Sequence, residues 1–148
     1  MTVNRCMIIS TLPYSPAIGE WAILLSTEDW ADREGISGAM RNSIAVMNTK
    51  GGVGKSTLVL ALAETISTHH GKNVLVIDSD SQASLSSMLM TVQSLYKLQS
   101  EGATIVDYLY GTVLKNETID WPKYIVRNIS DVDDARTVYL LPSDMQLT

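Results

Sequence analysis

The glycine-rich segment 50–57, which reads KGGVGKST, restricts the fold of this chain more than any other feature. Before it, Ser43–Met47 is a nearly continuous apolar run, which suits a strand covered on both faces, as strands of parallel sheets are. After it, apolar residues recur at helical spacing from Val59 to Ile66, and Gly71 stands where a helix would end. The sequence therefore predicts a strand, a glycine-rich loop and a helix in that order.

This order is typical of the phosphate-binding loop (P-loop) of proteins that bind nucleoside triphosphates. Glycines let the backbone approach an anion and turn N–H groups toward it, and the following helix presents its positive end there. With ATP and Mg²⁺ as cofactors, Lys55 would reach the β- and γ-phosphates, Ser56 would bind Mg²⁺, and Thr57 would donate to phosphate oxygens. The residues expected to hold the nucleotide are Gly51, Gly52, Val53, Gly54, Lys55, Ser56 and Thr57.

The loop departs from the strict P-loop pattern, because Thr49 stands where the opening glycine is expected and Lys50 precedes the glycine pair. This arrangement resembles the deviant Walker-A ATPases of the ParA/MinD family, with their AAA_31/CbiA-like nucleotide-binding domain. The resemblance implies an α/β P-loop NTPase fold, with a mostly parallel sheet flanked by helices. It also implies a catalytic role for Lys50 beside Lys55, because the extra lysine of the family crosses the ATP-dependent homodimer interface and contacts the partner's phosphates.

A second candidate site follows the apolar run Asn73–Asp78, which reads as another buried parallel strand. Such a strand delivers its last residues to the carboxyl edge of the sheet, where open α/β sheets bind ligands. Asp78 and Asp80 would point the same way if the strand continued, although a loop would redirect the second carboxylate. An ordinary solvated turn is the alternative, and the neighbouring phosphate loop disfavours it because Mg²⁺ and water chemistry need carboxylates.

This second segment resembles the Walker A′ and switch I region of ParA proteins, whose usual form is D-x-D-P-Q-G-N-x-S. The resemblance gives Asp80 the role of positioning or activating the attacking water, and Asp78 is expected to support the magnesium shell together with Ser56. Gln82 and Ser86 also match the family pattern. The departures, which leave the shape of the loop and the hydrolysis rate open, are Ser81 for proline, Ala83 for glycine and Ser84 for asparagine.

Signals after this segment are weaker. Apolar residues from Leu85 to Leu95 recur at helical spacing and predict a stripe that faces the core, with a methionine-rich partner groove as the alternative. Thr104 is expected to cap a short helix that runs through Leu109 and ends at Gly111.

The last part of the chain combines an irregular stretch with one further strand. Segment 117–134 contains clustered acids and a Trp-Pro pair, and we expect it to be irregular and exposed. Val138–Leu141 predicts a strand. The triplet at 141–143, Leu-Pro-Ser, resembles the "IPS" strand end of the family.

Both ends of the chain differ from the family. Family members continue past the position of Thr148 into a Walker B strand, an apolar run ending in aspartate beside the P-loop strand, and no second run of this kind occurs here. We therefore expect residues 40–148 to be the amino-terminal part of a longer ATPase, truncated before the Walker B strand, with an apolar sheet edge left unpaired. Residues 1–39 are expected to be an amino-terminal extension that need not be native, because Met40 is a candidate start. Within it, Ser26 and Asp29 predict a capping box for a short helix.

Composition limits the partners of the chain. A formal charge of −5 disfavours DNA binding by this chain alone, so nonspecific DNA binding is expected only through regions that it lacks. No stretch is long and apolar enough for a membrane span, and a single cysteine fits a reducing cytoplasm.

The resemblance implies ATPase activity in plasmid or chromosome partitioning, with a ParB-type centromere-binding protein as the partner that stimulates hydrolysis. Whether this chain itself hydrolyses ATP stays open, because the Walker B region is not present. The alternatives are a MinD-like regulator of division-site placement, which Gln82 disfavours, and a non-catalytic remnant that binds nucleotide.

Overall fold

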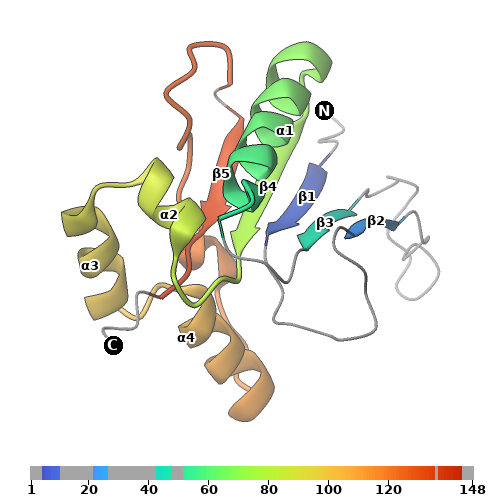
Figure 1. The fold of residues 1–148 in the computed structure, drawn as a ribbon. Helices are drawn as coiled ribbons and strands as arrows, with labels where there is room; N and C mark the ends of the chain where they lie inside the picture. Colours follow the sequence, from blue (N-terminus) through green and yellow to red (C-terminus); the bar gives the residue numbers. More distant parts are fainter. Residues whose placement is uncertain (1–4, 11–21, 27–42, 48–51, 136, 145–148) are drawn as a thin grey trace.

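One mostly parallel sheet organises the chain (Figure 1). The computed structural model describes residues 5–10, 22–26, 43–47, 52–135 and 137–144. Its five strands lie in the spatial order β2 (Ala22–Ser26), β3 (Ser43–Met47), β1 (Arg5–Ser10), β4 (Asn73–Asp78) and β5 (Val138–Leu141). Only the pair of β2 and β3 is antiparallel, and the other neighbours are parallel. The α/β class and the strands predicted at β3, β4 and β5 are confirmed.

Strand β1 lies at the centre of this sheet, although it comes from the segment that we expected to be an extension. Its register places Ile8 opposite Ile44 of β3 on one side and opposite Val76 of β4 on the other. Strand β2 pairs with the second edge of β3. The expectation of an unpaired edge beside the P-loop strand is therefore wrong, because β1 and β2 cover both of its edges. The short helix expected after Ser26 falls outside the described residues.

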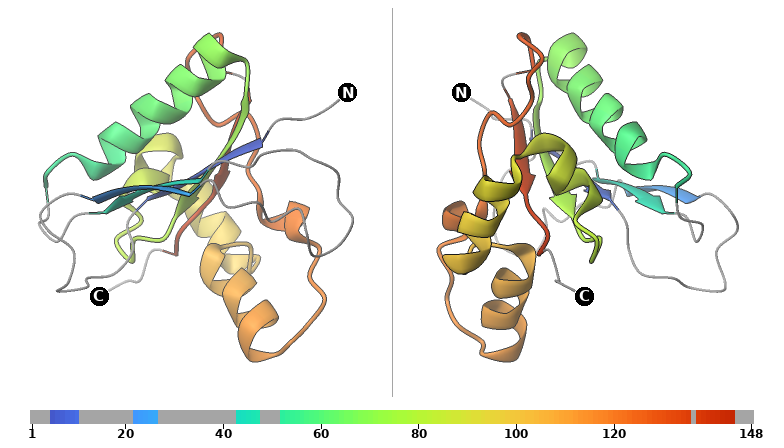
Figure 2. Two further views of the ribbon diagram at one scale, coloured as in Figure 1. Left: turned by 90° about the vertical axis from the view of Figure 1, so that its right-hand side faces the viewer. Right: turned by 60° about the vertical axis from the view of Figure 1, so that its left-hand side comes forward.

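The described residues form four α-helices. They are α1 (Lys55–His70), α2 (Ser84–Leu89), α3 (Val92–Ser100) and α4 (Ile105–Leu109), followed by the π-helix η2 (Tyr110–Leu114) and the 3₁₀-helix η3 (Trp121–Tyr124). Helix α1 covers one face of the sheet (Figures 1 and 2) and contacts β4, β1, β3 and β5. It ends as predicted at Gly71, whose left-handed backbone (φ 56°) lets its N–H donate to the carbonyl of Ile66.

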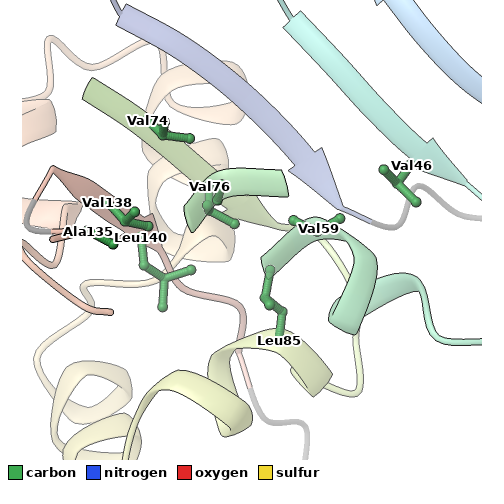
Figure 3. Packing of buried hydrophobic residues seen from close by; sticks show 9 residues of the cluster. Val46, Val59, Val74, Val76, Leu85, Ala135, Val138 and Leu140 are labelled. Atoms are coloured by element: carbon green, nitrogen blue, oxygen red, sulfur yellow. The ribbon is translucent and has the colours of Figure 1, made fainter. Parts of the chain in front are cut away.

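The core lies between α1, α2 and the sheet (Figure 3). Alternate residues of β4 are buried, as a strand with two different faces requires: Val74, Val76 and Asp78 point to the more buried side. Val59 of α1 and Leu85 of α2 pack against this side, and both are fully buried. Because α2 packs on α1 and the core, the loop that joins β4 to α2 is fixed at both of its ends.

The apolar stripe predicted from Leu85 to Leu95 is divided between two helices. The chain is extended at Met90, and Thr91 caps α3 by accepting a hydrogen bond from the Ser94 N–H. Leu85 and Leu95 are buried, but Met88 is 51% exposed. The prediction of one continuous core-facing stripe is therefore only partly correct, since the break changes which residues face the core.

Thr104 caps α4 as predicted, in a capping box with Asp107. Gly111, however, does not end the helix, because the chain continues through it as a π-helix. A Cβ atom at Gly111 would lie 2.3 Å from Cδ1 of Ile119. The glycine therefore permits a close approach between segments instead of a helix end.

The segment 117–134 is mostly irregular, but it is less exposed than predicted. Val126 forms a bridge with Leu140, in which the two N–H groups donate to the opposite carbonyls at 2.8 and 2.9 Å. Ile129 N–H donates to the carbonyl of Val138, and Tyr124 is buried. This segment covers the outer edge of β5, which would otherwise present unpaired backbone groups.

Candidate phosphate site and carboxylate loop

The glycine-rich loop joins β3 to α1, as the sequence predicts. Gly52 (φ 71°) and Gly54 (φ 86°) have left-handed backbones. Among the described residues, chain neighbours aside, no atom lies within 4 Å of a Cβ built on either glycine, so positive φ is the reason for glycine at these two positions. Lys50 and Gly51 fall outside the described residues.

The first turn of α1 carries the remaining residues of the predicted phosphate site. Gly54 is the N-cap, and it has no side chain that would accept a hydrogen bond from the first-turn N–H groups. No acidic residue occurs in that turn. Lys55 is its first residue, followed by Ser56 and Thr57; Val53, Lys55 and Ser56 are half-buried and Thr57 is exposed. A helix end without a side-chain cap and without negative charge suits an anion such as phosphate.

The carboxylates after β4 lie at the same edge of the sheet. Ser10 at the end of β1 is in register with Val46 of β3 on one side and with Asp78 of β4 on the other. Two strand spacings therefore separate Val46 from Asp78, about 10 Å. Because the three strands are parallel, β3 and β4 end at the same carboxyl edge of the sheet, on the two sides of β1.

Asp78 is fully buried and forms hydrogen bonds within the protein. One carboxylate oxygen, Oδ2, accepts from the N–H of Ser86 at 2.8 Å and from its hydroxyl at 2.6 Å. The other, Oδ1, accepts from the N–H of Asp80 at 3.2 Å. Desolvation raises the pKa of Asp78, and the hydrogen bonds from Ser86 and Asp80 oppose this rise. Asp78 thus takes over the capping of α2, because Ala83 at its N-cap has no side-chain acceptor.

Asp80 lies in the loop after the strand and not on it, since β4 ends at Asp78. The loop redirects its carboxylate, which accepts from Gln82 N–H at 3.0 Å through Oδ1 and from the Ser84 hydroxyl at 3.3 Å through Oδ2. The side chain is half-buried, while Ser81 and Gln82 beside it are exposed. An ionised carboxylate accepts about four hydrogen bonds, so this group keeps capacity for a water molecule.

Two departures from the resembled family pattern have local explanations in this loop. Ala83 has a left-handed backbone (φ 49°, ψ 36°) at the position where the pattern has glycine. Ala83 therefore adopts a conformation that glycine reaches without strain, at a cost of roughly 1–2 kcal/mol for other residues. Ser84 replaces asparagine, and its hydroxyl still donates to Asp80.

Sequence reasoning did not assign Ser143 to this site. It follows β5, is 3% exposed, and donates from its N–H to the Ser86 hydroxyl oxygen at 3.0 Å. Its own hydroxyl donates to the carbonyl of Asp80 at 2.5 Å. The preceding Pro142 carbonyl accepts from Ile105 N–H at the start of α4. The Leu-Pro-Ser triplet was the available signal, but its contacts span 57 and 63 residues of sequence.

The side chains present fit MgATP better than a metal held by the protein alone. Within the described ranges, no group of three or more His, Cys, Asp or Glu side chains is arranged to hold a metal ion. Mg²⁺ is usually bound through one or two carboxylates or hydroxyls together with substrate phosphates, which matches a donor set of Ser56 and a nearby acid. The described part of the chain also contains no helix long and apolar enough to cross a membrane.

A left-handed glycine loop at the start of a helix, beside a second parallel strand that ends in a carboxylate, defines a P-loop NTPase. Comparison with family models confirms this class, since residues 41–148 match the family model AAA_31, described as an AAA domain. The match covers more than half of the chain, which therefore belongs to this family of nucleotide-binding domains. No curated protein and no solved structure matches the chain significantly.

Proposed function

We propose that this chain is the MgATP-binding segment of a ParA-type ATPase that acts in plasmid or chromosome partitioning. The observation that carries the proposal is the pairing of the lysine-preceded loop KGGVGKST with the Asp78–Asp80 loop at one edge of a parallel sheet. An extra lysine at position 50 is the feature that separates the ParA/MinD pattern from other P-loops.

Different residues of the site bind the nucleotide and assist its hydrolysis. The N–H groups of 52–57 and the Lys55 ammonium bind the phosphates, and the Ser56 hydroxyl binds Mg²⁺. When bound, Mg²⁺ neutralises charge that develops on the phosphates. Asp80 orients the attacking water through the remaining acceptor capacity of its carboxylate. Asp78 supports the magnesium shell through the loop that it holds, since both of its oxygens already accept hydrogen bonds.

Assembly is part of the proposal. Lys50 reaches the phosphates of a second subunit in an ATP-dependent homodimer, and a ParB-type centromere-binding protein stimulates hydrolysis. Nonspecific DNA binding then belongs to other regions, since the charge of −5 gives this chain no excess of basic residues for phosphate contacts.

A nucleotide-binding remnant without turnover is the second candidate. The observation in its favour is that β4 is the only described strand that ends in an acidic residue, and this residue is committed to hydrogen bonds with Ser86 and Asp80. A MinD-like regulator is a weaker candidate, because Gln82 matches the ParA form of the switch loop.

Calorimetric titration of the full chain with MgATP tests the proposal. Lys55→Ala removes the phosphate-binding ammonium and should weaken binding at least tenfold, which corresponds to about 1.4 kcal/mol. Lys97→Ala is the matched control, because Lys97 is an exposed lysine on α3 and should leave binding unchanged. Absence of MgATP binding in the wild type, or equal binding by Lys55→Ala, would exclude the proposed site.

The two candidates separate on further readouts of the same material. ATP-dependent dimerisation that Lys50→Ala abolishes, together with measurable phosphate release, supports the ParA-type ATPase. Saturable MgATP binding without phosphate release supports the remnant.

A further inference from the structure

Three buried polar groups connect β4, α2 and β5 behind the phosphate edge. The Ser86 hydroxyl lies between Asp78 and Ser143, and all three residues are nearly inaccessible to solvent. We call Asp78, Ser86 and Ser143 the serine network. Binding of phosphate does not require it, since none of its members belongs to the glycine loop or to α1.

The direction of each hydrogen bond in the serine network follows from the chemistry of its donors. The Ser143 backbone N–H can only donate, so the Ser86 oxygen accepts there. The Ser86 hydroxyl proton is then directed to Asp78 Oδ2, which is 2.6 Å away. A buried network in which every member has a partner fixes one arrangement of its residues.

The Ser143 hydroxyl extends this arrangement to the carboxylate loop. The Asp80 carbonyl accepts from the Ala83 N–H at 2.9 Å and from the Ser143 hydroxyl at 2.5 Å. The first bond is local and sets the shape of the turn. The second comes from the end of β5 and sets the position of the turn relative to the sheet.

The tip of the loop is exposed, although Ala83 at its end is fully buried. Ser81 and Gln82 are exposed and make little packing contribution, and position 81 lacks the rigidity that proline would give. A further hydrogen bond, from the Asp80 N–H to Asp78 Oδ1, attaches the start of the loop to the end of β4. The bonds from Gln82 N–H and the Ser84 hydroxyl to the Asp80 carboxylate lie within the loop itself. They shape the loop without attaching it to β5.

We propose that Ser143 is a positioning residue that fixes Asp80 against the sheet edge that carries the phosphate loop. The effect of Ser143 on hydrolysis rests on the proposed ATPase function. The effect of Ser143 on the position of the loop is independent of it. Ser143 does not contact the nucleotide in this account. It acts through Asp80, and Ser86 holds Ser143 in place through its backbone N–H.

The test compares Ser143→Ala with Ser67→Ala in the full chain. Ser67 is also 3% exposed, and its hydroxyl pairs with Thr137 Oγ1 at 2.8 Å, far from the phosphate edge. Both variants lose one buried hydroxyl and should lose similar global stability. Amide hydrogen exchange at Gln82 and Ala83, measured by NMR without nucleotide, should be at least tenfold faster in Ser143→Ala and unchanged relative to global exchange in Ser67→Ala.

Restoration and turnover complete the test. Ser143→Thr keeps the hydroxyl and should restore slow exchange; if its added methyl group prevents folding, Ser143→Cys supplies a weaker donor without a branch. Where the wild type hydrolyses ATP, Ser143→Ala should lower kcat roughly tenfold and leave KM within about twofold.

Amide exchange in the loop tests whether Ser143 positions it, and kcat tests the consequence for hydrolysis. Equal exchange at Gln82 and Ala83 in wild type and Ser143→Ala would overturn it, and so would equal acceleration in Ser67→Ala. If exchange is faster only in Ser143→Ala and the wild type hydrolyses no ATP, the positioning role is supported and the proposed ATPase activity is contradicted. An unchanged kcat in a hydrolysing chain with a loosened loop would overturn the part that concerns hydrolysis.

Discussion

Replacing the buried Asp78 with alanine should destabilise the fold by about 3 kcal/mol. The change removes the acceptor of three donors: the Ser86 N–H, the Ser86 hydroxyl and the Asp80 N–H. Each buried donor left unpaired costs about 1–3 kcal/mol. Relief from holding a carboxylate in a desolvated place, which its raised pKa expresses, offsets part of this sum. The net cost is a large share of the roughly 5–15 kcal/mol that stabilises a typical domain.

Urea unfolding followed by circular dichroism measures this cost for the full chain. Asp131→Ala is the matched control, since Asp131 is exposed and its loss should change stability by no more than about 0.5 kcal/mol. Asp78→Asn keeps one oxygen acceptor and should fall between the two. If Asp78→Ala is as stable as Asp131→Ala, then Asp78 does not organise α2 and the Asp80 loop as described.

Three further predictions concern pH, the glycine loop and the central strand. Because burial raises the pKa of Asp78 above its ordinary value of 3.8, the folded state binds more protons than the unfolded state between the two values. The stability of wild type minus that of Asp78→Asn, measured without Mg²⁺, should therefore decrease as pH rises through this interval; a constant or increasing difference would contradict the assigned environment. Gly54→Ala and Gly71→Ala both place alanine at positive φ, and thermal melts should show a loss of about 1–2 kcal/mol for each. Only Gly54→Ala should weaken MgATP binding in calorimetry. Equal effects on binding would show that the glycine loop is not the phosphate site. Ile8→Pro removes a backbone N–H from a strand paired on both sides and should cost about 3 kcal/mol or more. Ile8→Ala is the control, because it keeps that N–H. Equal urea midpoints for the two variants would show that β1 is not a central strand.

The parts of the fold that the sequence predicts correctly are those with local causes. The continuous apolar runs of β3 and β4 identify buried strands, and Gly71 ends α1 because it adopts positive φ. The capping box at Thr104 is likewise a contact between residues three apart. In each case the residues that carry the signal are the residues that form the structure.

The parts that the sequence does not predict depend on contacts between distant segments. Nothing in the apolar run of β1 indicates that it pairs between β3 and β4, since both partners lie more than thirty residues away. The edge of β5 determines that Val126 is bridged and not exposed. Ser143 is a further example, because a serine after a strand has many possible partners and only the fold brings Asp80 to it.

We propose that nucleotide phosphates bind at the start of α1, at the sheet edge that also carries the Asp80 loop. The most direct measurement is a two-dimensional NMR titration of the ¹⁵N-labelled full chain with Mg²⁺ and the β,γ-imido analogue of ATP. We expect the largest amide shift changes in 52–57 and 80–83, and only small changes in α3. Unchanged amides in 52–57, or the largest changes on α3 or in 117–134, would contradict it.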